Sequence, residues 1–275
     1  MPESEKQDFI GFPPPLLGER PWRLPVLFNA DGLLILDAPA GVLAGVHDWY
    51  GWAPNLADAI GWQAGKGKNE LRRLEIGEVE PVFTLEPELT GAVLLTKNSE
   101  AKAFYRNQYG SLQMCLCFCF VALQEGDASE AVCDLPLVQE GRKRRMTVSH
   151  REGKSAQTLF TRLEQLGRYS LWEARTHYCR TQQIRVHALE CGLQIPGDGL
   201  YSGERGVFLS QIKSVYRPSR SGREERPLYE GLCLHLGGVE FQTSEGESIR
   251  VEAPLPKKFG ALLKLLRRHS KPCVP

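Results

Sequence analysis

The stretch C-R-T-Q-Q-I-R-V-H-A-L-E-C-G-L-Q-I-P-G-D-G-L-Y-S-G, from Cys179 to Gly203, is the most distinctive part of the sequence. Its first half, Arg180 to His187, puts two arginines and two amides at the start of an expected helix. Gly192 is typical of a helix end, because glycine adopts the left-handed conformation without steric cost. Ile195 to Asp198 then predicts a turn. A run with this many specific polar positions is rarely a generic core element.

The composition around this stretch is that of an ordinary globular protein. The 275 residues are 42% hydrophobic and 24% charged, enough for one large domain or two small ones. The net charge of +1 does not by itself demand a polyanionic partner. The basic residues nevertheless cluster at 142–145, 217–226, 257–258 and 264–271. Such clusters can contact phosphates, but they can equally form a solvated surface.

The cysteine usage favours a reduced, cytoplasmic protein. There are eight cysteines, and residues 1–20 are polar and proline-rich, unlike a secretory leader. No apolar run approaches the ~20 residues that cross a bilayer, so we expect no membrane association. Cys115, Cys117 and Cys119 would share one face of a strand. We expect them to pack in the core, because no second group of ligands with metal-site spacing accompanies them.

Hydrophobic patterning predicts an α+β fold in which strands and helices interleave without a strict βαβ rhythm. Residues 1–24 are expected to be a loose lead-in. The other expected elements are two strands around a turn at 29–32, helices at 55–62 and 99–109, a central strand at 112–123 and a C-terminal helix around 259–266. In the second helix we expect Ser99 to be the N-cap. The segment 156–166 fits a helical and a strand period equally well.

The opening stretch resembles the R-T-H-Q-I-R-V-H … P-I-x-G-D-x-x-Y-G signature of the RluA-type pseudouridine synthases, which isomerise uridine in RNA. Weaker similarities to this family occur in the same order along the chain at Asp37–Gly41, Lys154–Thr158, Leu234–His235 and Ala253–Pro256. The resemblance implies the pseudouridine synthase fold, a mixed and mostly antiparallel sheet with flanking helices and an RNA cleft. It also favours a strand at 156–166 and one catalytic-type domain at 25–275, with no N-terminal S4 domain.

The family motif that carries the chemistry, H-R-L-D-R-x-T-S-G, resembles residues 83–91, which read F-T-L-E-P-E-L-T-G. Leu85 and Gly91 match, and Glu86 stands at the position of the nucleophilic aspartate. The other family side chains are replaced: histidine by Phe83, the two arginines by Thr84 and Pro87, and the base-packing tyrosine by a residue of 113–118, where this chain reads Q-M-C-L-C-F. The resemblance therefore identifies a divergent member of the family.

The resemblance makes Arg185 the partner of the catalytic carboxylate, here Glu86. A nearby cation keeps a carboxylate ionised, and a charge-assisted hydrogen bond fixes its direction. Glutamate keeps the charge but displaces its oxygens by roughly 1 Å, a misplacement that can cost about a hundredfold in rate. Glu86 is therefore either a structural or binding carboxylate or a working nucleophile. Glu88 is the alternative carboxylate if the register is shifted.

Five residues are the candidate RNA contacts: Arg180, Thr181, Gln183, Arg175 and Tyr201. Arginines can bind phosphates, and for Arg180 a structural role is an equal alternative. Asp198 is expected to cap the local backbone of its turn. His187 is expected to be a hydrogen-bonded core histidine.

Three functions remain open at this level. The first is an RNA pseudouridine synthase, an isomerase of RNA modification that works on structured rRNA or tRNA with Glu86. The second is an inactive relative that binds RNA, for example as an assembly factor. The third is a carboxylate enzyme for another nucleoside. The resemblance implies no metal and no organic cofactor, and a monomer.

Overall fold

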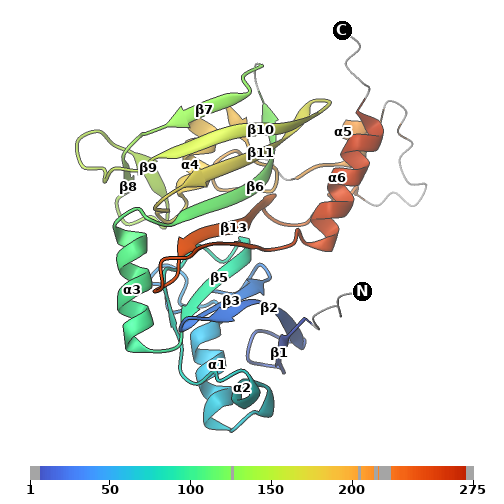
Figure 1. Cartoon of the computed structure of the whole chain (residues 1–275). Helices are drawn as coiled ribbons and strands as arrows, with labels where there is room; N and C mark the ends of the chain where they lie inside the picture. Colours follow the sequence, from blue (N-terminus) through green and yellow to red (C-terminus); the bar gives the residue numbers. More distant parts are fainter. Residues whose placement is uncertain (1–6, 125–126, 204–205, 214–215, 217–223, 271–275) are drawn as a thin grey trace. The chain divides into compact units, whose positions relative to one another are not determined.

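The computed structural model describes residues 7–124, 127–203, 206–213, 216 and 224–270. The chain forms two compact units: unit 1 holds residues 1–116 and 236–254, and unit 2 holds residues 117–235 and 255–275. Each unit combines antiparallel strands with helices (Figure 1), which confirms the expected α+β class. Most of the basic stretch 217–226 lies outside the described residues.

The sheet of unit 1 combines strands from the beginning of the chain with a strand from near its C-terminal end. Its strand order is β1 (Phe9–Phe12), β2 (Trp22–Ala30), β3 (Leu33–Ala38), β5 (Thr90–Thr96) and β13 (Leu234–Gln242). Two further strands pair antiparallel at its side, β4 (Glu80–Pro81) with β5 and β14 (Ser248–Glu252) with β13. The expected turn between β2 and β3 is confirmed: Asp31 and Gly32 have φ values of 50° and 69°, as a two-residue hairpin turn requires.

The expectation of a loose lead-in over residues 1–24 was wrong for residues 9–12. Residues 9–12 form β1, which pairs antiparallel with β2 from Phe9–Pro25 to Phe12–Trp22. Ile10 and Phe12 are 0% and 1% exposed. The proline-rich composition of 13–15 belongs to the connection between two strands, and the apolar alternation around it decides the structure.

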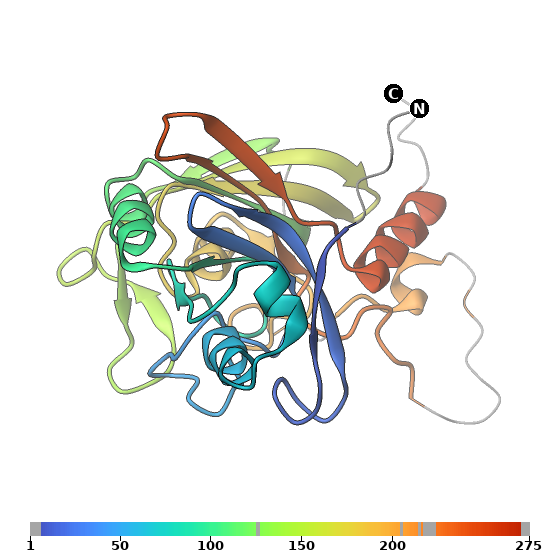
Figure 2. The same cartoon turned by 60° about the horizontal axis from the view of Figure 1, so that its bottom comes forward.

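Helices α1 (Leu56–Gly65) and α2 (Asn69–Arg73) lie beside each other against the strands of unit 1 (Figure 2). Leu56, Ile60 and Leu71 join Leu34 and Leu36 in one buried cluster. The Asn55 side chain caps α1 by accepting a hydrogen bond from the Asp58 backbone N–H at 2.9 Å.

Helix α3 (Ser99–Gly110) begins one residue after its cap. The N-cap is Asn98 and not Ser99 as expected, because the Asn98 side-chain oxygen accepts from the Ala101 N–H at 2.8 Å. Asparagine caps at least as well as serine. Tyr105 of α3 packs edge-on against Phe241 of β13, with ring centroids 5.8 Å apart.

Unit 2 contains β6 (Cys115–Gln124), β11 (Tyr169–Thr176), β10 (Thr158–Leu166) and β7 (Glu130–Cys133) in that order. β12 (Leu193–Gln194) pairs with β6, and β8 (Leu137–Gln139) pairs with β9 (Met146–Val148) as a separate ribbon. The ambiguous segment 156–166 is thus a strand, as the resemblance favoured. Phe120 and Phe160, whose centroids are 5.8 Å apart, are among its fully buried side chains.

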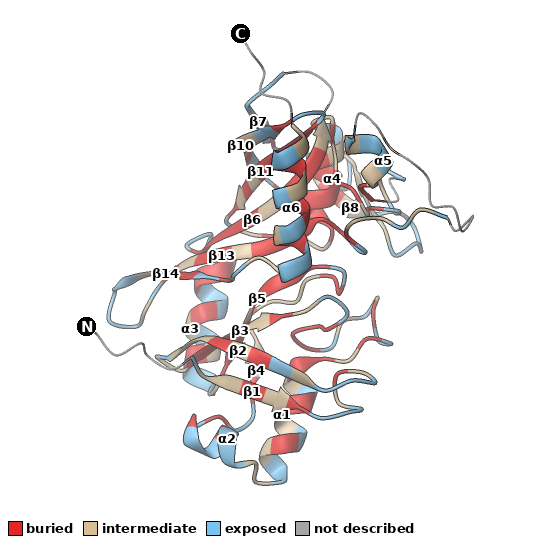
Figure 3. Ribbon diagram, turned by 90° about the vertical axis from the view of Figure 1, so that its right-hand side faces the viewer, coloured by how far each residue is buried: buried red, intermediate tan, exposed pale blue. Residues whose placement is uncertain are grey.

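Three helices belong to unit 2: α4 (Gln183–Glu190), the short α5 (Leu209–Ile212) and α6 (Lys257–His269). Helix α6 is amphipathic, with Phe259, Leu262, Leu263 and Leu266 buried. Helix α4 differs, because every residue from Gln183 to Ala188 is buried, and Figure 3 shows it in the buried colour along most of its length.

The three alternating cysteines of β6 lie in packed surroundings. Cys115 and Cys117 are buried, Cys119 is partly buried, and burial raises the pKa of the Cys119 thiol to about 11. Within the described ranges, no group of three or more histidine, cysteine or acidic side chains is placed to hold a metal ion. Over the same residues, no helix is both long and apolar enough to traverse a bilayer.

Candidate functional site

A buried ion pair organises the stretch from Cys179 to Gly203. Arg185 on α4 donates from Nε to Oδ2 of Asp198 at 3.0 Å and from Nη2 to Oδ1 at 2.6 Å. The two side chains are only 4% and 2% exposed. Two parallel charge-assisted hydrogen bonds fix a guanidinium in one plane. The turn 195–198 therefore serves to bring a carboxylate back to the arginine of the helix.

Asp198 has a second task, which confirms its expected capping role. Its Oδ1 accepts hydrogen bonds from the backbone N–H groups of Leu200 at 3.1 Å and Tyr201 at 3.2 Å. The capping followed from the Pro-Gly-Asp-Gly turn, whereas the ion pair with Arg185 was missed. The two residues are 13 apart across a helix end and a turn, and local sequence rules do not reach that far.

Gly197 makes this turn possible. Its φ of +83° lies in the left-handed region, and a Cβ built on it would stand 1.9 Å from the Gly231 carbonyl oxygen. Any side chain would meet backbone there, so the turn depends on glycine. Its neighbour Gly199 has nothing within 4 Å of such a Cβ.

Gln183, an expected RNA contact, is completely buried within unit 2. Its amide donates to the Gln157 carbonyl oxygen at 3.0 Å and to Oγ1 of Thr158 and Thr176, both at 3.1 Å. Its side-chain oxygen accepts from the Arg180 N–H at 2.9 Å. This gives the side chain a structural role, since a contact with RNA would require it to leave these partners.

His187 is a hydrogen-bonded core residue, as expected. It is fully buried, and its Nδ1 lies 2.9 Å from Oγ1 of Thr158. Its Nε2 lies 2.9 Å from the Leu135 carbonyl oxygen. Because a carbonyl only accepts, the proton belongs on Nε2. The histidine thus links α4 to Thr158 at the start of β10 and to the backbone at Leu135.

Tyr201 lies between two arginines. The guanidinium carbons of Arg145 and Arg185 are 5.0 and 5.3 Å from its ring centroid, within cation–π range. Its hydroxyl also bonds to the Met146 backbone and to Gln182. The half-buried ring thus holds the α4 region and the β9 strand together.

The remaining candidate contacts of unit 2 lie partly at the surface. Arg180 donates from Nε to the Ser155 carbonyl oxygen at 2.9 Å, and its guanidinium stacks 5.2 Å from the Tyr178 ring centroid. Arg175 lies 3.7 Å from a Glu173 oxygen, a long and partly screened ion pair. Thr181 is half-buried. Part of each of these three side chains, Arg180, Arg175 and Thr181, therefore remains accessible to a phosphate.

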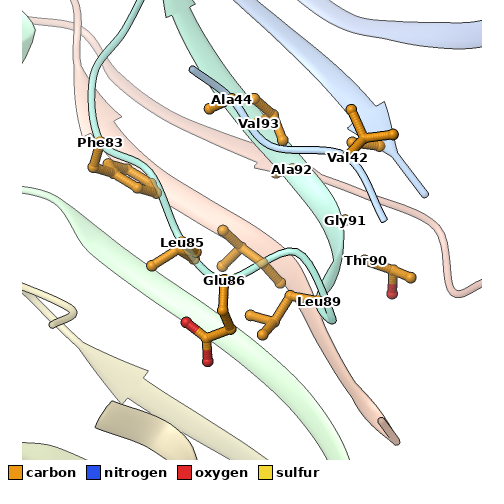
Figure 4. A pocket seen from close by; sticks show the side chains of 12 residues that line it. Val42, Ala44, Phe83, Leu85, Glu86, Leu89, Thr90, Gly91, Ala92 and Val93 are labelled. Carbon is orange, nitrogen blue, oxygen red and sulfur yellow. The ribbon is translucent and has the colours of Figure 1, made fainter. Parts of the chain in front are cut away.

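The Glu86 segment belongs to unit 1 and lies on the loop that leads into β5. A cavity of about 30 Å³, lined by Val42, Ala44, Leu85, Glu86 and Leu89 among others, lies at this loop. This is room for about one water molecule. Figure 4 shows that the Glu86 carboxylate turns away from the aliphatic side chains of Val42 and Ala44. Glu86 is 5% exposed whereas Glu88 is exposed, so the two carboxylates have opposite surroundings.

Backbone contacts hold this loop in place. The Gly41 N–H donates to the Pro87 carbonyl oxygen at 2.6 Å. Gly91 has φ +116°, and a Cβ there would lie 2.2 Å from the Leu236 carbonyl oxygen. The match of Gly91 to the family motif thus has a physical reason, because only glycine allows the loop to enter β5 this close to β13.

Phe83, which stands where the family has histidine, is a packing residue of unit 1. Its ring stacks on Tyr109 with centroids 4.6 Å apart and planes at 26°. An offset-stacked pair of this kind contributes about 0.5–1.5 kcal/mol beyond its buried area. The position therefore contributes to stability and brings no titratable group to the loop.

Asp37 is a partly buried carboxylate whose pKa is raised, and it was not among the predicted site residues. It lies on β3 opposite Ala92 of β5, and burial raises its pKa to about 6. Its neighbour Ala38 lines the cavity beside Glu86. An acidic residue inside an otherwise apolar strand was the signal that could have revealed Asp37.

The predicted contact between Glu86 and Arg185 joins residues of different units and stays a prediction. What the structure describes is the surroundings of each residue within its own unit. Arg185 is held by Asp198, and Glu86 is buried on a loop fixed by backbone contacts.

Comparisons with known proteins agree with this architecture. No protein-family model matches the sequence. The chain is 28% identical over 265 residues to an uncharacterized RNA pseudouridine synthase of Chlorobaculum parvum, covering 94% of this chain and 79% of that protein. It is 28% identical over 258 residues to the ribosomal large subunit pseudouridine synthase D of Nitrosomonas europaea, covering 92% and 68%.

Solved structures give the same answer for the fold. Human RNA pseudouridylate synthase domain containing 4 superposes with a TM-score of 0.67 at 18% identity, covering 88% of this chain and 92% of that one. Human RNA pseudouridylate synthase domain containing 1 gives 0.55 at 18% identity, covering 90% and 96%. The fold is that of the pseudouridine synthases. The sequence relatives carry the same name, so this chain is similar to RNA pseudouridine synthases in both sequence and fold.

Proposed function

We propose that this protein binds structured RNA, an rRNA or a tRNA, and that Glu86 occupies the place of the catalytic carboxylate of its relatives. The observation that carries the proposal is the Arg185–Asp198 pair with its glycine turn, because it retains the arginine half of the family signature as a rigid, buried unit. Arg180, Arg175, Thr181 and Tyr201 are the RNA-facing candidates on the same unit. The protein acts as a monomer in the cytoplasm.

Two forms of this function lead to different products. In the first, Glu86 is the nucleophile, and Arg185 keeps its carboxylate ionised and oriented while the glycosidic bond of a flipped-out uridine breaks and re-forms at carbon. In the second, the protein binds RNA without isomerising it and serves as an assembly factor. No metal or organic cofactor takes part in either form.

Two observations favour the second form. Phe83 is engaged in a stacked aromatic pair where the family has a histidine. Thr84 and Pro87 carry no charge where the family has arginines. The base-flipping step costs a few kcal/mol, and fewer polar groups remain on this loop to recover that cost.

The test is to incubate the purified protein with total cellular RNA and to quantify pseudouridine by nucleoside mass spectrometry. New pseudouridine that disappears in Glu86→Gln supports the enzyme. No pseudouridine, together with RNA binding whose affinity falls steeply with salt, supports the binding protein. Absence of both product and binding contradicts the proposal. Glu88→Gln is the matched control, because Glu88 lies two residues away and is exposed.

A further inference from the structure

The segment from Leu43 to Asn55 in unit 1, which we call the aromatic loop, carries an aromatic cluster that the function above does not use. It contains His47, Trp49, Tyr50 and Trp52 within six residues. Trp52 is 68% exposed. A tryptophan presented so fully to solvent is unusual, since the side chain is highly buried on average in folded proteins.

The aromatic loop is closed at its neck. The Leu43 N–H donates to the Pro54 carbonyl oxygen, and the Leu56 N–H donates to the Leu43 carbonyl oxygen, both at 2.9 Å. Inside the loop, the Tyr50 N–H donates to His47 O at 3.1 Å and the Ala53 N–H to Tyr50 O at 2.9 Å. A loop with joined ends and two internal turns has the character of a compact Ω-loop.

The interior of the aromatic loop is packed by its own side chains. Leu43, Tyr50 and Ala53 form a buried cluster against which Trp49 packs. The His47 ring lies 4.9 Å from the Tyr50 ring, and its Nδ1 accepts a hydrogen bond from the Trp49 N–H at 3.1 Å. The backbone at Trp52 thus lies in a turn of an internally packed loop, so a ligand that stacks on the indole loses little of its affinity to ordering the loop.

The neck of the aromatic loop is attached to the Glu86 segment within the same unit. Val42 and Ala44 line the cavity together with Leu85 and Glu86 (Figure 4). The Gly41 N–H donates a hydrogen bond to the Pro87 carbonyl oxygen. The residues at the base of the aromatic loop therefore line the same pocket as Glu86.

We propose that Trp52 is a stacking platform for an unpaired nucleobase of the bound RNA. The inference rests on the proposed function and adds a contact site to it. In the aromatic loop, Val46 and Trp52 are the exposed large hydrophobic side chains, 76% and 68% exposed, beside Gly51 and the exposed Asp48, and the indole of Trp52 offers a flat π-face. One flat face suits a splayed-out base, which proteins recognise by stacking on aromatic side chains, better than it suits a protein partner, whose interface takes about 800 Å² from each side.

Trp62 on α1 provides a matched control. It is 55% exposed and belongs to the same unit, but it lies outside the aromatic loop, with the Lys66 ammonium 5.8 Å from its ring. Removing either tryptophan deletes one exposed indole. Only Trp52→Ala removes the proposed platform.

The experiment compares wild type, Trp52→Ala, Trp52→Phe and Trp62→Ala by fluorescence anisotropy. The probes are a labelled RNA hairpin with an unpaired eight-nucleotide loop and a fully paired RNA duplex of the same length. Base stacking contributes about 1–3 kcal/mol by alanine substitution, so Trp52→Ala should weaken hairpin binding by roughly 5- to 150-fold. Trp52→Phe should keep most of the affinity, and Trp62→Ala and all duplex affinities should change less than about twofold.

The outcomes separate this inference from the proposed function. If wild type binds the hairpin and Trp52→Ala binds it equally well, the platform is refuted and RNA binding stands. If wild type binds neither probe, both fail. If Trp52→Ala instead converts a self-associating protein to a monomer in analytical ultracentrifugation, the face is an interface between copies and the platform is refuted. Circular dichroism verifies that each variant is folded.

Discussion

The two halves of the family signature are held in place by different physical means. In unit 2, Arg185 and Asp198 form a buried ion pair whose donors and acceptors reach both helix and turn. In unit 1, the loop of Glu86 is positioned by a glycine at a close backbone approach and by a backbone hydrogen bond. The ion pair depends on two side chains of opposite charge, whereas the Glu86 loop depends on the space around a glycine and on a backbone contact.

Breaking the ion pair should have the largest effect. Asp198→Ala leaves the Arg185 guanidinium buried beside a cavity, and loss of one partner of a buried pair costs about 3–5 kcal/mol. We expect the free energy of unfolding, measured by urea denaturation, to fall by this amount. Asp198→Asn, which keeps the oxygen that accepts from the Leu200 and Tyr201 N–H groups, should cost less. Equal stability of Asp198→Ala and wild type would show that the pair does not hold the turn.

The dependence of both regions on glycine should give the next largest effect. In Gly91→Ala and Gly197→Ala, the new Cβ would meet backbone oxygens at 2.2 and 1.9 Å in a left-handed conformation. Strain and overpacking of this kind cost about 1–3 kcal/mol each. Gly199→Ala, with open space around its Cβ, is the control and should change stability by less than about 0.5 kcal/mol. Thermal denaturation of the three variants in parallel measures these differences.

Asp37→Asn should stabilise the protein at neutral pH, because it removes a partly buried charge from the sheet of unit 1. Burial raises the pKa of Asp37 from 3.8 to about 6, so the folded state holds the proton more tightly than the unfolded state does. The penalty for the charged form grows as pH rises from 3.8 to 6 and is complete above that range. After allowance for its partial exposure, we expect a gain of about 1–2 kcal/mol at pH 8.

The check is the pH dependence of that gain. Urea denaturation at pH 4 and pH 8 should show only a small difference between Asp37→Asn and wild type at the lower value and the full difference at the higher one. A gain of equal size at both pH values would mean that the amide stabilises by another route, because the charge of Asp37 is absent at low pH.

The sequence allowed prediction of what depends on local patterns and on the family resemblance. The turn at Asp31–Gly32, the capping role of Asp198 and the core position of His187 each follow from a few neighbouring residues. The Arg185–Asp198 pair depends on where a turn returns the chain. The raised pKa of Asp37 depends on burial by other strands. These are tertiary effects, which no local rule includes, and the β1 strand was missed because its partner β2 supplies the reason for it to form.

The smallest expected effect concerns His47, which packs inside the aromatic loop that carries Trp52. Burial is the largest influence on its pKa and lowers it, against the smaller opposing influence of Asp48, and the neutral ring accepts from the Trp49 N–H. The folded state thus binds the proton less tightly than the unfolded state, so this contribution to stability is present above pH 6.5 and is lost as pH falls through the lower folded value. We expect acidification from pH 7.5 to 5 to loosen the aromatic loop by less than about 1 kcal/mol.

Faster exchange of the Trp49 amide proton, measured by NMR, would report this loosening. His47→Asn should remove the pH dependence, since asparagine offers an acceptor oxygen that does not titrate, and a persisting pH dependence would assign the effect to another group.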